Sequence, residues 1–105
     1  MSYTKVNYED VEPRAPGMHF LREALDCENQ GVTVIDADAD WTGMEHDHAD
    51  QDHEEVYVLV EGAGTLTVEG EDIVLDPGDA VRVAPTASRV LTFHESSTMV
   101  AVGAP

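Results

Sequence analysis

Histidine and carboxylate side chains concentrate in one short stretch of the sequence. Residues 45–55 read EHDHADQDHEE and contain three of the five histidines of the chain. His46 and His48 are two residues apart, so on a strand both imidazoles would project from the same face and provide two nitrogen ligands for one metal ion. This spacing favours a metal site. A solvated acidic loop that attracts water and salt cations is the alternative interpretation of the same stretch.

A third ligand is expected from the strand that follows. Glu55 shares strand parity with Tyr57 and Leu59, whereas Glu54 would point to the opposite face, so Glu55 is the better candidate. His53 precedes the strand and is a further candidate ligand from the loop. Tyr57 is expected to line the same interior, either as a packing residue or with its hydroxyl in the site.

The elements that must position these residues are short strands separated by glycine and proline turns. One or two helical turns are predicted over residues 20–25, and Pro13 and Pro16 predict an extended arm over residues 1–17. β-Branched residues and period-two alternation predict strands at residues 32–38, 55–60, 65–68, 73–75, 80–83, 89–93 and 98–102. Strands at this spacing indicate an all-β sandwich or small barrel.

Length and charge limit the class of protein. The 105 residues suit a single domain with one core. With 22 acidic residues against 5 basic ones, the formal net charge is -17, which argues against nucleic acid and against an anionic membrane surface as partners. Acidic residues spread along the whole chain favour adaptation to high salt over a local cation-binding surface. Cys27 is the single cysteine, and no signal-like or membrane-length apolar segment occurs, so a cytoplasmic location is expected.

Two motifs resemble those of the cupin family. The first cupin motif combines H-x-H with a glutamate and, seven residues later, a glycine; here His46 and His48 lead to Glu55 and Gly62. The second has the pattern G-D-x-V-x-V-P-P-G-x-x-H, which residues 78–89 follow in register. The resemblance covers residues 32–102 and implies a double-stranded β-helix, or jelly-roll, barrel of two antiparallel sheets. It also implies a divalent metal, Fe, Mn, Ni or Zn, bound by the two histidines, the glutamate and a histidine of the second motif.

The chain departs from both motifs. Six residues separate His48 from Glu55, where three or four are usual, so His53 is an alternative third ligand. Arg89 occupies the position of the second-motif histidine, and a guanidinium cannot ligate a metal. Three protein ligands would leave open positions for water or substrate. Alternatively, Arg89 binds an anionic ligand, or it pairs with Glu55 and no metal binds.

The resemblance leaves two classes of function. One is a metal-dependent enzyme acting on a small polar molecule, with Arg89 orienting an anionic group of the substrate. The other is a non-catalytic sensor or binding module that retains the ligand pocket around a degenerate metal site. Cupins often pair through edge strands and N-terminal arms, so a homodimer is expected by resemblance.

Overall fold

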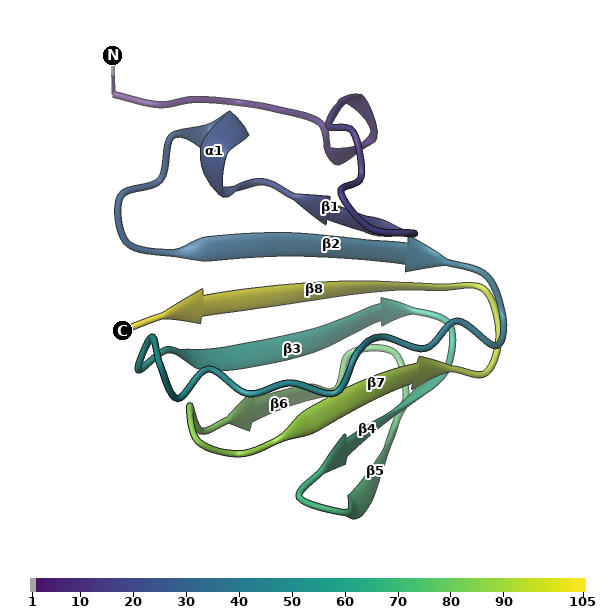
Figure 1. Ribbon diagram of the computed structural model, residues 1–105. Helices are drawn as coiled ribbons and strands as arrows, with labels where there is room; N and C mark the ends of the chain where they lie inside the picture. Colours follow the sequence, from purple (N-terminus) through teal and green to yellow (C-terminus); the bar gives the residue numbers. More distant parts are fainter. Residues whose placement is uncertain (1) are drawn as a thin grey trace.

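The chain folds as two antiparallel sheets that face each other. A computed structural model describes residues 2–105, and Figure 1 shows the path of the chain. The larger sheet has the strand order β1-β2-β8-β3-β6, and the smaller one has the order β5-β4-β7. The strands are β1 (Met18–Phe20), β2 (Gly31–Ala37), β3 (Glu54–Glu61), β4 (Gly64–Val68), β5 (Glu71–Leu75), β6 (Ala80–Val83), β7 (Arg89–Phe93) and β8 (Ser97–Ala104). The all-β prediction is confirmed, and every predicted strand is present within a few residues of its predicted bounds.

The apolar core lies between the two sheets. Alternation along β3, β7 and β8 directs every second side chain inward, as expected for sheets with one buried face. Leu59, Leu66, Phe93 and Met99 are fully buried there. The hairpin that follows β3 needs a glycine, because Gly62 has a φ of 98° and an added Cβ would collide with the hydroxyl of Ser97.

The N-terminal segment differs in detail from its prediction. The helical turn α1 covers Arg22–Leu25, whereas Phe20 belongs to the short strand β1, which was not predicted. Phe20 pairs with Thr33 of β2, so hydrogen bonding to a distant strand overrides the local helical pattern there.

The predicted arm lies against its own chain. It contains a 3-10 turn, η1 (Tyr8–Asp10), and the Tyr8 hydroxyl donates a hydrogen bond to Asp36 at 2.7 Å. The use of this arm in a homodimer stays a prediction. Within residues 2–105 no helix is long and apolar enough to cross a membrane.

A segment without regular secondary structure completes the wall of the smaller sheet. Residues 38–53 run beside β7, and the ribbon in Figure 1 follows the sheet there. His46 and Arg89 exchange two backbone hydrogen bonds, N to O, of 2.9 and 2.8 Å, and Gly43 N donates to Leu91 O at 2.9 Å. The histidines therefore come from an irregular segment and not from a regular strand.

Candidate metal centre and ligand cavity

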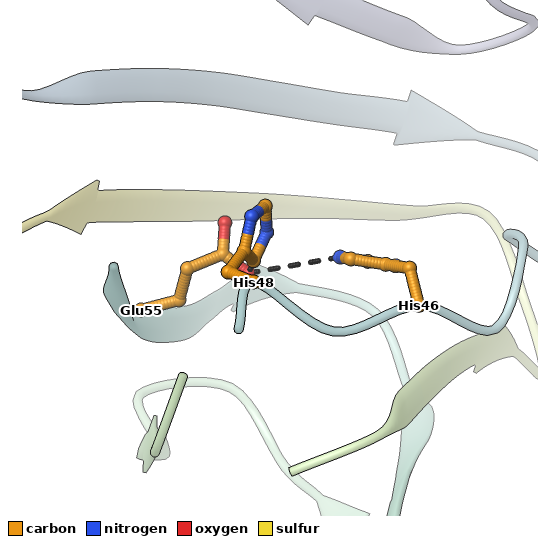
Figure 2. A group of neighbouring side chains, drawn as sticks. All are labelled: His46, His48 and Glu55. Atoms are coloured by element: carbon orange, nitrogen blue, oxygen red, sulfur yellow. Dashed lines mark ion pairs between the residues drawn. The ribbon is translucent and has the colours of Figure 1, made fainter. Parts of the chain in front are cut away.

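Three of the predicted ligands converge on one point between the sheets. A nitrogen of His46, a nitrogen of His48 and a carboxylate oxygen of Glu55 all lie within 4.8 Å of one another. Figure 2 shows the two rings, from the segment beside β7, directed toward the carboxylate from β3. His48 Nε2 lies 3.2 Å from Glu55 Oε1, and His46 Nε2 lies 3.8 Å from the same oxygen.

Backbone hydrogen bonds hold both histidines next to the second cupin motif, residues 78–89. His46 is held by its paired bonds to Arg89, and His48 N donates to Pro85 O at 2.8 Å. Six residues separate His48 from Glu55, and the turn that they form brings the chain back to β3 in the right register. The longer spacing between the two ligands is therefore compatible with convergence of His46, His48 and Glu55.

The other ring nitrogen of each histidine is occupied. His46 Nδ1 lies 3.0 Å from the carbonyl oxygen of Met44, and His48 Nδ1 lies 2.7 Å from Oε1 of Gln51. Because an amide oxygen only accepts, both Nδ1 atoms carry a proton and donate, so in the neutral rings the Nε2 lone pairs are directed at Glu55. His48 Nε2 is buried, and its approach to Glu55 does not form a hydrogen bond. An orphaned buried acceptor beside a carboxylate is the arrangement that a cation would complete.

Glu55 is held as a carboxylate. Its burial favours the neutral acid, but the neighbouring His46 ring and a hydrogen bond from the Tyr57 hydroxyl, at 2.5 Å, outweigh burial. The positive charge of Arg89, and that of His48 when its ring is protonated, act in the same direction, and together these contacts lower the pKa of Glu55 to about 2. Glu55 in turn raises the pKa of His46, because the carboxylate stabilises the protonated ring, against the opposing effect of burial. Burial, with the neighbouring carboxylate, raises the pKa of Tyr57.

This donor set fits a divalent transition metal. Two imidazole nitrogens and one carboxylate oxygen suit Zn and similar ions, and bonds of about 2.1 Å place neighbouring ligand atoms about 3.0–3.4 Å apart. The separations of 3.2 and 3.8 Å between the histidine nitrogens and Glu55 Oε1 are close to this range. A metal bound by three protein ligands keeps positions open for water or a substrate.

Arg89 lies beside this group, and its side chain is only 1% exposed. Its Nη2 donates to Ala84 O at 2.9 Å, but its Nε and Nη1 have no hydrogen-bond partner among residues 2–105. Nη1 lies 4.0 Å from Glu55 Oε1, which is too long for a hydrogen bond. Arg89 therefore adds a buried positive charge with two unsatisfied donors to the site.

The remaining predicted residues occupy distinct places. His53 lines the same cavity but is not part of the group of three close donors. Glu54 is exposed and forms an ion pair with Arg82 at 2.7 Å, so Glu55 is the glutamate that faces inward. Tyr57 is buried, lines the cavity and contacts Glu55. His94, the fifth histidine, is exposed and contacts the hydroxyl of Thr65, away from the site.

Two contributors to the site were missed from the sequence. Gln51 and the carbonyl group of Met44 orient the histidine rings, and nothing in residue type or spacing distinguishes Gln51 from its acidic neighbours. Both residues line a cavity of about 740 Å³ that opens beside the three ligands. This volume is in the usual range for a small-molecule site.

Comparisons with known proteins agree with this architecture. The cupin domain model matches residues 34–102. No curated protein matches the chain significantly. A crystal structure of a cupin protein from Bacteroides fragilis superposes with a TM-score of 0.84 at 22% identity, covering 99% of this chain and 85% of that one.

Two further solved structures carry functional names. A cupin-superfamily sugar phosphate isomerase from Silicibacter pomeroyi has a TM-score of 0.75 at 18% identity, covering 96% of this chain and 75% of that one. A predicted oxalate decarboxylase from Thermotoga maritima also has a TM-score of 0.75, at 16% identity, and covers 96% and 98%. These likenesses show the fold, and the domain match spans most of the chain. The chain belongs to the cupin family.

Proposed function

We propose that this cupin binds a divalent transition metal, Fe, Mn, Ni or Zn, through His46, His48 and Glu55, and that the bound metal and Arg89 together hold a small anionic ligand. The observation that supports the proposal is the convergence of one donor atom each from His46, His48 and Glu55. The second ring nitrogen of each histidine is already hydrogen bonded. Such outer contacts orient metal ligands and set their tautomer. When bound, the metal would supply Lewis-acid chemistry or an oxygen-activating centre.

Arg89 supports the anionic character of the ligand. Its Nε and Nη1 are buried without partners, and burying such donors is unfavourable unless a ligand satisfies them. A carboxylate or phosphate accepts paired hydrogen bonds from a guanidinium. With neutral histidines, a divalent ion, Arg89 and the Glu55 carboxylate sum to a positive site, so an anion gains electrostatic attraction as well.

The same buried arginine favours a second candidate function. If Glu55 and Arg89 remain paired and no metal enters, the cavity is a metal-free anion-binding module of the sensor type. An assay for chemical conversion of the ligand distinguishes a metal-dependent enzyme from a sensor, because a sensor binds its ligand without changing it. The isomerase and decarboxylase names of the two structural neighbours support screening for those two reactions first.

Elemental analysis of untagged protein tests the metal assignment. We expect about one metal ion per chain, after purification or after reconstitution, and its loss in a His46→Ala/His48→Ala variant. His94→Ala is the matched control, because that histidine is exposed and outside the site. His53→Ala should retain the metal, since His53 is not one of the three close donors. If wild-type protein takes up no metal, or the double variant keeps it, the metal assignment is wrong.

A further inference from the structure

The cavity wall next to Glu55 consists of residues without bulky side chains. The strand register places Gly31 opposite Gly103, and Gly103 opposite Glu55. In the next inward-facing row, Thr33 lies opposite Ala101, and Ala101 opposite Tyr57. The five-stranded sheet is therefore hollowed beside the metal ligand, although strands generally disfavour glycine.

The hollow is open space. A Cβ added at Gly31 would have Gly103 O as its nearest neighbour, at 4.0 Å, so no atom of the described residues fills this volume. At Gly103, by contrast, an added Cβ would approach Glu55 Cγ at 3.1 Å. A side chain at position 103 would thus press on the metal ligand, whereas one at position 31 would project into the cavity.

Most of the rest of the wall is apolar, although Arg22, Thr42, Gln51 and His53 also line the cavity. Side chains of Met18, Phe20, Ile35, Trp41 and Leu91 surround the cavity beyond the small residues. The Tyr57 hydroxyl already donates a hydrogen bond to Glu55, and the Trp41 indole N–H donates one to Pro16 O at 2.8 Å. In the two rows beside Glu55, the hydroxyl of Thr33 is the remaining side-chain hydroxyl for a ligand.

The cavity thus has two chemically different ends. At one end lie the metal ligands and the unsatisfied donors of Arg89, which is more than nine-tenths buried. At the other end lie the hollow over Gly31 and the apolar wall. We infer that the ligand is a carboxylate with an apolar ring or chain, whose carboxylate contacts Arg89 and whose body fills the hollow. This inference rests on the proposed function, because the carboxylate group lies where the metal and Arg89 are proposed to bind an anion.

A polyhydroxylated acid of the same size fits this cavity poorly. Each hydroxyl group that leaves water needs a partner, and a buried hydroxyl without one is unfavourable. An apolar ring, in contrast, gains from burial against Phe20 and Leu91 and needs no partner there. The wall therefore selects on the body of the ligand, and Arg89 selects on its charge.

Two ring carboxylates of equal ring size test the inference. Cyclohexanecarboxylate and glucuronate each carry one carboxylate on a six-membered ring, and they differ in the hydroxyl groups and the ring oxygen. Calorimetry with Zn-loaded protein should show that cyclohexanecarboxylate binds at least tenfold more tightly than glucuronate. Gly31→Ala should weaken binding of cyclohexanecarboxylate, and Gly31→Ile should weaken it by a further tenfold or more.

Controls separate this inference from the proposed function. Val32→Ile enlarges the next side chain on β2, on the opposite face of the sheet, and should change neither affinity. Metal content should be the same in all these variants, since none is a ligand, and circular dichroism checks their folding. Equal or tighter binding of glucuronate to wild-type protein would overturn the inference while leaving the metal and anion site in place. Absence of both zinc uptake and anion binding would overturn the proposed function and the inference with it.

Discussion

Replacing Arg89 by methionine should change metal affinity and anion affinity in opposite directions. Methionine has a similar length and is apolar, so Arg89→Met removes the charge and the two unsatisfied donors with little loss of volume. The hydrogen bond from Nη2 to Ala84 O is lost as well.

The expected gain in metal affinity follows from Coulomb's law. Arg89 Nη1 lies 4.0 Å from Glu55 Oε1. A metal bonded to that oxygen at about 2.1 Å lies at most about 6 Å from the guanidinium nitrogen. At an effective dielectric constant of about 20, a divalent ion and a single charge at that distance repel by roughly 5 kcal/mol. The His46 side chain is 42% exposed, so solvent screening reduces this value, and we expect a tenfold to hundredfold gain.

The anion should respond in the opposite way. A hydrogen bond to a charged group contributes about 1.5–3 kcal/mol, which corresponds to roughly a tenfold to hundredfold loss of affinity when Arg89 is removed. The thermal midpoint of the metal-free variant should stay the same or rise, because a buried guanidinium with two unsatisfied donors is unfavourable. Glu55 does not become an isolated charge, since His46, His48 and Tyr57 remain beside it.

Competition with a chelator measures the metal affinity, and calorimetry with cyclohexanecarboxylate measures the anion affinity. Arg82→Met is the matched control, because it removes the same charge from an exposed arginine on β6 that pairs with Glu54. An Arg89→Met protein with unchanged affinity for both metal and anion would refute this reasoning. A decrease in metal affinity would show that Arg89 supports the metal site and does not oppose it.

Three other predictions concern the metal ligands and the charge of the chain. Tyr57→Phe removes the hydroxyl that donates to Glu55 and should lower metal affinity about tenfold, measured by the same chelator competition, with little change in fold. Metal affinity should rise with pH through the raised pKa of His46 and then level off, because a proton competes for its Nε2 below that pKa; a titration that is flat between pH 5 and 8 would contradict this. With a net charge of -17, the thermal midpoint should rise from low to molar salt as carboxylate repulsion is screened, and a midpoint indifferent to salt would reject the proposed salt adaptation.

The fold was largely predictable because its signals are local. Period-two alternation and turn glycines mark each strand from β2 to β8, and strand parity selects Glu55 over Glu54. The position of β1 was not predictable in this way. Phe20 follows a helical pattern in sequence but pairs with Thr33, and no local signal encodes that partner.

The site was predictable in its residue types but not in its contacts. The spacing of His46 and His48 indicates ligands on one face, yet the backbone that carries them forms an irregular segment held by bonds to β7. Gln51, which hydrogen bonds with the ring of His48, has no feature in the sequence that distinguishes it from the other residues of the acidic loop. The burial of Arg89 depends on both sheets closing over it, which residue spacing does not specify.

The pairing of His46 with Arg89 explains how one substitution can change the chemistry of the site. Because the two residues exchange backbone hydrogen bonds, the ring of one and the guanidinium of the other enter the site from fixed neighbouring positions. A histidine at position 89 would offer a fourth metal ligand from this backbone, as the cupin motif implies. Arginine is longer, cannot ligate, and donates hydrogen bonds in a planar fork. The same backbone would therefore replace a metal ligand with hydrogen-bond donors for an anion, and an anion bound to Arg89 would lie beside the residues that would hold the metal.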